Sequence, residues 1–139
     1  MATKDEVLQL LAQVELFEGL SKSELKKIYG LSKELTFAEG DTVIAAAGKG
    51  GRFYLIVDGE AAITIQDRPE SVIGVGAYFG EMSLIDGEPR SATVTAKTPL
   101  CTLTLASFHF RPLMLEHPTI AQKLLVTLSK RVRALEPHS

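Results

Sequence analysis

Apolar residues recur every three or four positions at the start of the chain, which is the spacing of an amphipathic helix. Charged residues at 4–6 lead into this pattern, and Gly19 interrupts it. The pattern therefore predicts a first helix whose buried side is formed by Val7, Leu8, Leu10, Leu11 and Val14.

A second helix is predicted directly after Gly19. Ser21 and Glu24 have the spacing of a capping box, with serine as N-cap and glutamate as the third helical residue. The buried stripe of this helix should be Leu25, Ile28 and Leu31. Its solvated face should carry lysines, because lysine is rarely buried without a partner; these are Lys22, Lys26 and Lys27.

From residue 34 onward the pattern changes to short runs rich in β-branched and aromatic residues, separated by breaks that contain glycine or proline. The Asp58-Gly59 break predicts a tight hairpin, because glycine accepts the positive φ that such a turn requires. Seven or eight short strands at this spacing predict a sandwich or a jelly-roll barrel. The runs are 35–37, 42–46, 52–57, 61–66, 72–75, 92–96 and 100–105.

Helical spacing returns near the end of the chain. Ser107 is the predicted N-cap of a short helix over 108–115, and Pro112 within it predicts that this helix is broken or begins later. Pro118 suits the first turn of another helix, where its missing N–H costs nothing. Pro137 should end that helix, whose apolar face is marked by Ile120, Leu124, Leu128, Val132 and Leu135.

This order of elements predicts one mainly β domain with flanking helices over 1–139. We expect a helical segment over 1–32, an eight-stranded jelly-roll β barrel over 33–106, and C-terminal lid helices over 107–135. The length of 139 residues suits one domain with one core.

The charge balance excludes some partners. A net charge of −2 and a pI of about 5.9 give no overall electrostatic footprint for nucleic acid or for an anionic membrane. Cys101 is the single cysteine of the chain, so no disulfide can form within it. No apolar run approaches the roughly 20 residues that cross a bilayer, and no apolar leader follows the charged start. We therefore expect a cytoplasmic protein.

Polar residues gather late in the strand-rich region. Gly80 permits an unusual backbone angle and the close approach of a ligand. The residues after it, 81–85, can form one helical turn whose free N–H groups favour an anion. Arg90 offers a planar fork of donors, Ser91 adds a hydroxyl, and Ala92 keeps the wall small. These groups describe a compact pocket for a singly charged phosphate.

Glu81 would repel that phosphate, but an ionised carboxylate can accept a hydrogen bond from a ribose hydroxyl. Phosphate and ribose groups within one loop indicate a nucleotide. The chain has no Walker A or dinucleotide-binding motif, so a triphosphate or a dinucleotide is not supported. A structural ion pair between Glu81 and Arg90 is the alternative interpretation.

The stretch Phe79-Gly-Glu-Met-Ser-Leu-Ile85, followed by Pro89-Arg-Ser-Ala-Thr-Val94, resembles the phosphate-binding cassette of the cyclic nucleotide-binding domain. That module is shared by the bacterial catabolite activator protein, the regulatory subunits of protein kinase A, and cyclic-nucleotide-gated channels. The resemblance covers roughly residues 16–135, since segments 16–20, 39–41 and 53–59 also look like the family's turns and third strand.

The resemblance implies a role for each matched residue. Glu81 would bind the ribose 2′-hydroxyl, Arg90 the exocyclic phosphate oxygens, and Ser91 the phosphate. A lid over the nucleobase would come from the last helix near Arg131. Serine rather than threonine at position 91 favours cAMP, with cGMP as the other candidate ligand. The nucleotide-binding residues implied are Phe79, Gly80, Glu81, Met82, Ser83, Arg90, Ser91, Ala92 and Arg131.

The expected function is that of a sensor in which ligand binding moves the C-terminal helix, without catalytic residues, metal or other cofactor. Its expected partner is a second copy or an effector protein that contacts this helix. Met1 and the ordinary tail of the sequence favour a complete small protein, and a recognition helix for DNA is not expected because only four residues follow residue 135. The alternative is a regulatory fragment of a longer channel, kinase, acyltransferase or transcription factor chain. A metal enzyme of the cupin type is a remote alternative, because 34–105 contains no histidine.

Overall fold

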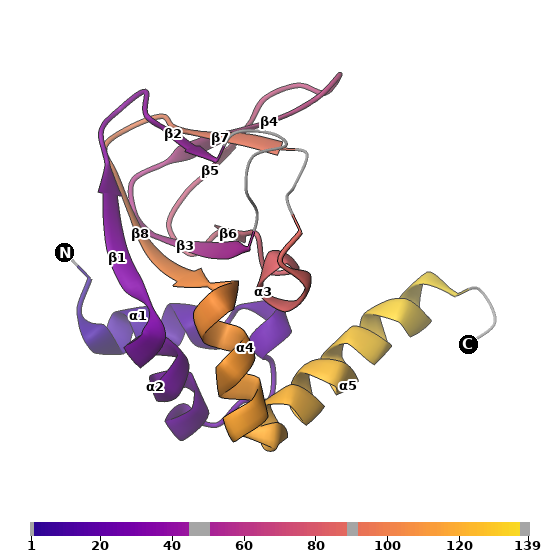
Figure 1. Cartoon of the computed structure of the whole chain (residues 1–139). Helices are drawn as coiled ribbons and strands as arrows, with labels where there is room; N and C mark the ends of the chain where they lie inside the picture. The colour runs from indigo at the N-terminus through magenta and orange to yellow at the C-terminus, as the bar shows by residue number, and fades with distance from the viewer. Residues whose placement is uncertain (1, 45–50, 89–91, 137–139) are drawn as a thin grey trace.

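The computed structural model describes residues 2–44, 51–88 and 92–136 (Figure 1). Within these residues, helices flank a region of eight strands on both sides. The helical elements are α1 (Lys4–Ala12), the 3₁₀ turn η1 (Glu15–Phe17), α2 (Lys22–Leu31), α3 (Ser83–Asp86), α4 (Ser107–Glu116) and α5 (Pro118–Leu135). The strands are β1 (Lys33–Phe37), β2 (Thr42–Ile44), β3 (Arg52–Asp58), β4 (Ala61–Ile65), β5 (Ser71–Ile73), β6 (Tyr78–Phe79), β7 (Ala92–Ala96) and β8 (Leu100–Ala106).

The strands pair as if the whole β region were one long hairpin, the first strand with the last and so on inward. β1 pairs with β8, β2 with β7, β3 with β6 and β4 with β5, all antiparallel. This hairpin is folded over into two four-stranded sheets with the orders β1-β8-β3-β6 and β2-β7-β4-β5. The predicted eight-stranded jelly roll with flanking helices is therefore confirmed.

The predicted tight hairpin at Asp58-Gly59 is wrong. β3 and β4 meet there, but the two strands lie in different sheets. Gly59 does have a positive φ of 88°, and a Cβ at this position would collide with the carbonyl oxygen of Pro99. The glycine therefore serves a corner at which the chain crosses between sheets, packed against the turn between β7 and β8.

Both N-terminal helices begin with a capping box. The box predicted for α2 is confirmed, because the N–H of Glu24 donates to Ser21 Oγ at 3.1 Å and the N–H of Ser21 donates to the Glu24 carboxylate at 2.8 Å. Thr3 and Glu6 form the same arrangement at α1. The first two positions of the predicted α2 stripe are buried, but Leu31 is 36% exposed where the helix ends.

The core has two parts, which is why five consecutive residues of β3 are buried. One part lies between the helices and the outer face of the β1-β8-β3-β6 sheet, where Phe17 packs against Phe53 and Phe110 with ring centroids 5.7 and 6.1 Å apart. The other part lies between the two sheets and contains Ile56, Ala61, Val94, Ala96 and Leu100.

The start of α4 differs from the prediction. Ser107 is the first helical residue and not the N-cap, because its hydroxyl donates to the carbonyl of Leu84 at 2.9 Å. The position before the helix is Ala106, which provides no side-chain cap. Pro112 does not break the helix. A proline in a helix interior costs stability, but Phe110 and Leu113 bury one side of α4 and keep it in place.

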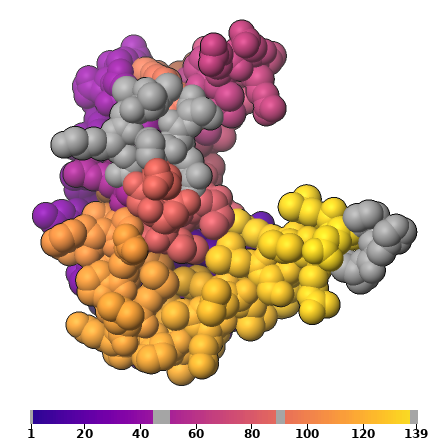
Figure 2. All heavy atoms as spheres, turned by 45° about the vertical axis from the view of Figure 1, so that its right-hand side comes forward, coloured from indigo at the N-terminus to yellow at the C-terminus, as the bar shows by residue number. Residues whose placement is uncertain are grey.

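α5 begins at Pro118 as predicted, and Ile120 and Leu124 are buried. Thr127 is also buried and Leu128 packs against the core, and the helix continues from there to project away from the barrel (Figures 1 and 2). Val132 and Leu135 are 56% and 85% exposed, so the predicted apolar face is covered as far as Leu128 and not beyond it. Among the described residues, no helix combines the length and the apolar character that crossing a membrane requires.

Candidate ligand-binding site

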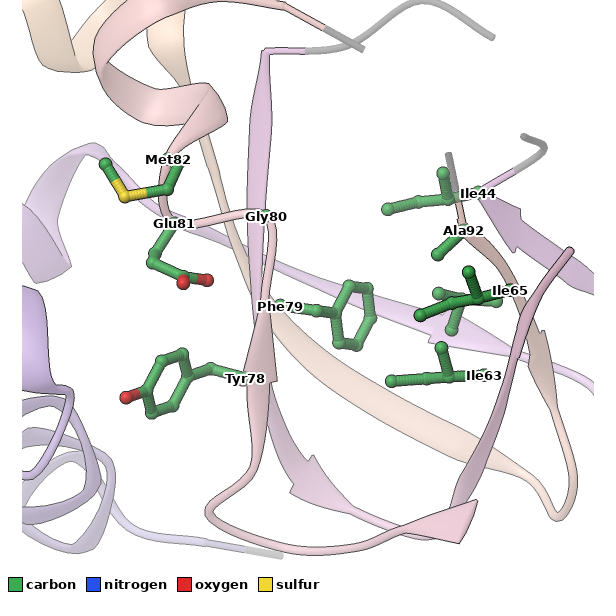
Figure 3. Close-up of a pocket in the computed structure, with 10 residues that line it drawn as sticks. Ile44, Ile63, Ile65, Tyr78, Phe79, Gly80, Glu81, Met82 and Ala92 are labelled. Carbon is green, nitrogen blue, oxygen red and sulfur yellow. The ribbon is translucent and has the colours of Figure 1, made fainter. Parts of the chain in front are cut away.

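A pocket of about 420 Å³ lies at the mouth of the barrel, between the two sheets (Figure 3). One wall comes from the β6 strand and the turn after it, and the other comes from β2, β4 and β7. The lining residues are Ile44, Ile63, Ile65, Tyr78, Phe79, Gly80, Glu81, Met82, Ala92 and Val94. The pocket thus brings together Phe79–Met82 and Ala92 of the predicted binding residues, but not Ser83.

The two sides of the β6 strand differ in character. Figure 3 shows the Phe79 ring pointing toward the isoleucines and Ala92 of the opposite wall. The side chains of Tyr78, Glu81 and Met82 lie on the other side of the strand. The wall between Phe79 and the isoleucines is therefore apolar, and the Glu81 carboxylate lies across the β6 strand from it.

Gly80 has the left-handed backbone angle that its sequence context predicts, with φ of 81°. The group that lies close to Gly80 belongs to the protein and not to a ligand. A Cβ at this position would collide with the carbonyl oxygen of Arg52 in β3. Glycine is thus required here for the β6 turn to lie against β3, whether or not a ligand approaches.

The turn after Gly80 is held by its own hydrogen bonds. The N–H of Ser83 donates to the carbonyl of Gly80 at 3.0 Å, and Ser83 Oγ donates to the carbonyl of Glu88 at 2.8 Å. Ser83 is 1% exposed and does not line the pocket, so its amide is used in the turn and not offered to a ligand. Within the described residues, the N–H groups of Glu81 and Met82 form no hydrogen bond.

Arg90 and Ser91, the residues expected to bind phosphate, lie outside the described residues. Their roles stay predictions. Ala92, the next residue, opens β7 and lines the pocket. The chain on either side of the predicted phosphate contacts therefore converges on this pocket.

Arg131 lies on α5 and is not part of the pocket lining. Its Nε donates to Glu15 Oε1 at 2.8 Å, and its Nη1 lies 3.4 Å from the sulfur of Met82. The backbone N–H of Glu15 in turn donates to the hydroxyl of Tyr78 at 3.2 Å. Arg131 therefore links α5 to two residues of the pocket wall without contacting the pocket itself, and its predicted contact with a nucleobase stays a prediction.

Glu15 is the residue of this group that sequence analysis did not identify. It follows the first predicted helix and precedes Arg131 by 116 positions. No local pattern signals such a pair, because a single glutamate in a turn is an ordinary solvated charge.

A second connection fixes the start of α5. The Glu24 carboxylate accepts hydrogen bonds from the Lys123 ammonium at 2.7 Å and from the Thr119 hydroxyl at 3.0 Å, besides its bond within the capping box. The Lys123 ammonium, and then the Ser21 N–H, lower the pKa of Glu24 to about 2 from its usual 4.5. α5 is thus tied to α2 near its start and to η1 near its end.

The part of the chain that the structure describes contains no group of three or more His, Cys, Asp or Glu side chains placed to hold a metal ion. The pocket lining includes one carboxylate, Glu81, and no histidine or cysteine.

Residues 34–117 match the family model described as the cyclic nucleotide-binding domain. The chain is 37% identical over 123 residues to a cyclic nucleotide-gated potassium channel of Mesorhizobium japonicum, which covers 88% of this chain and 34% of the channel. It is 28% identical over 130 residues to a CRP-like cAMP-activated global transcriptional regulator of Mycobacterium tuberculosis, covering 90% of this chain and 58% of the regulator. The chain thus spans about a third of the channel's length.

The fold also matches solved structures. The N-terminal domain of a transcriptional regulator from Streptomyces coelicolor superposes with a TM-score of 0.84 at 30% identity, covering 93% of this chain and 96% of that domain. The catabolite activator protein of Thermus thermophilus gives a TM-score of 0.67 at 27% identity, covering 86% of this chain and 59% of that protein.

Proposed function

The chain belongs to the cyclic nucleotide-binding domain family, and from this we propose that it binds a cyclic nucleotide, cAMP in preference to cGMP, in the pocket at the mouth of the barrel. One observation carries the proposal. The Phe79–Met82 segment and Ala92, which flank the predicted phosphate contacts, line a single pocket of about 420 Å³. That volume lies within the range of roughly 300–1,000 Å³ found for small-molecule sites.

The proposed roles follow from the chemistry of the residues. Arg90 neutralises the cyclic phosphate with its planar fork, and Ser91 adds a hydroxyl donor. Glu81 accepts the hydrogen bond of the ribose 2′-hydroxyl. Phe79 and the isoleucines across the pocket contact the apolar faces of the nucleoside. The proposed preference for cAMP over cGMP rests on a single residue, the serine at position 91.

We propose that the signal is a change in the position of α5. Arg131 contacts Glu15 and Met82, so a movement of the cassette turn on ligand binding changes the environment of an arginine on α5. The bond between Lys123 and Glu24 holds the start of the helix. Ligand binding then acts as a population shift between two positions of the distal half of α5. Closure of this half over the nucleobase requires Arg131 to leave Glu15.

The module would regulate and not catalyse, since the pocket offers recognition groups only. The relatives include a potassium channel, a transcriptional regulator and a cGMP-dependent protein kinase of Eimeria tenella, of which the chain covers 10%. We propose that α5 delivers the signal either to such an effector region or to a separate protein.

Calorimetric titration of cAMP and cGMP tests the proposal. We expect micromolar or tighter binding of cAMP, about −8 kcal/mol. Arg90→Ala should weaken binding by about 2–5 kcal/mol, because the bound phosphate loses its charged partner. Arg111→Ala, which removes an exposed arginine from α4, is the matched control and should bind like the wild type. Absence of heat with both nucleotides, or unchanged affinity in Arg90→Ala, would contradict the proposed function.

A further inference from the structure

A second cavity, of about 250 Å³, opens where the β1-β8-β3-β6 sheet meets α2 and α4. Three of its lining side chains are basic, and they come from three elements: Lys33 from β1, Arg52 from β3 and His109 from α4. The rest of the lining is Leu31, Leu35, Thr104 and Ala106. The cavity therefore combines a basic side with an apolar side and has no acidic residue in its lining.

Neither Lys33 nor Arg52 is neutralised by the protein. Within the described residues, neither side chain takes part in an ion pair. The acidic neighbour Glu34 alternates to the opposite face of β1, because it lies across from Leu103, a residue of the core under the helices. Like charges thus face the same small cavity, an arrangement that an anion in the cavity would stabilise.

Thr104 independently indicates that this cavity suits a ligand that accepts hydrogen bonds. Its side chain is 6% exposed, and its hydroxyl lies 2.9 Å from that of Thr102, which is fully buried. This single hydrogen bond uses one of the two hydroxyl protons, and within the described residues neither threonine forms another. Because Thr102 has no access to the cavity, it is best satisfied by donating to Thr104. The proton of Thr104 is then left to donate into the cavity that it lines.

The start of α4 adds partial positive charge to the basic side of this cavity. Ala106 and His109 line the cavity, so the first turn of this ten-residue helix lies beside it. The position before the helix has no side-chain cap, and the N–H of Ser107 is taken by the carbonyl of Gly51. The partial positive charge of an uncapped helix start favours an anion close by.

We propose that this cavity is a second ligand site, which binds the phosphate group of a small phosphomonoester. Lys33 and Arg52 neutralise a dianion, with Arg52 supplying a planar fork of donors, and Thr104 donates a hydrogen bond. Leu31 and Leu35 contact the carbon skeleton that carries the phosphate. Free inorganic phosphate has the same charged group without this skeleton and is the other source of the anion.

The second site shares a sheet face with the first. Phe79, Tyr54, Thr104 and Lys33 lie directly opposite one another on four neighbouring strands. Phe79 lines the first pocket, whereas Thr104 and Lys33 line the second. This row of side chains thus runs from one cavity to the other, and Tyr54, which lines neither of them, lies between the two.

Titration of the full chain with phenyl phosphate and with inorganic phosphate, followed by backbone amide shifts in NMR, tests this proposal. We expect saturable shifts at the amides of Lys33, Arg52 and His109. Lys33→Ala/Arg52→Ala should weaken phenyl phosphate binding at least tenfold. Lys26→Ala/Arg68→Ala removes the same two charges from exposed positions elsewhere and should bind like the wild type. Thr104→Val, of nearly the same shape, should weaken binding as well.

The two ligands distinguish the sources. Tighter binding of phenyl phosphate supports a phosphomonoester, and equal binding of both supports free phosphate at the same basic cavity. Shifts confined to the Glu81–Met82 turn, or equal affinities in the two double variants, would overturn the proposal. Equal affinities in the two double variants would overturn the second site without affecting the cyclic nucleotide site, which Arg90→Ala tests separately.

Discussion

Gly80 is the residue on which the shape of the candidate site depends most directly. Its φ of 81° and its contact with the carbonyl of Arg52 exclude a side chain at this position. We expect Gly80→Ala to lower the free energy of unfolding by about 1–3 kcal/mol from backbone strain, with a further loss from the displaced β3 contact. Urea denaturation measures this difference.

Gly30→Ala is the matched control for this substitution. Gly30 lies in α2 with no atom within 4 Å of an added Cβ. Alanine should stabilise the helix there by up to about 1 kcal/mol. If both alanine variants were equally stable, the close approach between the β6 turn and β3 would not hold.

Local residue chemistry predicted part of the site and missed its wider contacts. The left-handed angle of Gly80 follows from its place in the sequence pattern, but the carbonyl that excludes a Cβ belongs to β3, 28 positions earlier. Ser83 could be placed in the turn, yet only the structure shows that its amide is used by Gly80. The contacts of Gly80 and Ser83 depend on which chain segments lie together in the fold, and the local sequence around each residue does not show this.

At the scale of elements, the bond between α2 and α5 makes stability depend on pH. Glu24 has a pKa of about 2 in the folded protein against 4.5 as its usual value, first because of Lys123. Its contribution to stability is therefore fully present above about pH 4.5 and is lost as the pH falls through 2. We expect Glu24→Gln to destabilise the protein at pH 7 by about 1 kcal/mol, since solvent screens a pair of this kind.

Denaturation of the wild type and Glu24→Gln at a series of pH values measures this effect. Glutamine keeps the capping box of α2 but removes the charge that Lys123 contacts. The difference between the two proteins should shrink as the pH falls from 4.5 toward 2. Glu116→Gln, at an exposed position, should show little difference at any pH. A constant difference for Glu24→Gln would mean that its charge does not stabilise the α2–α5 contact.

The elements themselves were largely predictable, whereas their partners were not. Alternation and glycine-bearing breaks located most strands within a few residues, because these signals are local. β6 escaped prediction as a strand, since it has two residues and depends on β3 for its hydrogen bonds. The Asp58-Gly59 turn was misassigned for the same reason: a positive φ serves a hairpin and a corner between sheets equally well.

At the scale of the whole molecule, the exposed apolar residues of α5 predict self-association. Leu125, Leu128, Val132 and Leu135 follow the three-and-four spacing of a coiled-coil seam. Leu125, Val132 and Leu135 are 66%, 56% and 85% exposed, and Figure 2 shows this helix standing clear of the barrel. We expect the chain to form a dimer through α5, weak because the seam is short. Sedimentation over a range of concentrations measures this association.

A matched pair of variants tests the position of this interface. Leu125→Gln/Val132→Gln should give a monomer at concentrations where the wild type is dimeric. Phe108→Gln/Leu115→Gln removes two apolar residues of α4 that are even more exposed, at 83% and 84%, and should leave the dimer intact. A wild type that stays monomeric at high concentration would contradict the interface.

The aromatic residues around the pocket give the protein a built-in optical reporter. The chain has no tryptophan and three tyrosines. Tyr78 lines the pocket, and the ring of Tyr54 stacks on Phe79 with centroids 5.0 Å apart. Two of the three tyrosines therefore touch the pocket or its wall, so their ultraviolet emission should respond when the site is occupied, without any attached dye and without interference from indole.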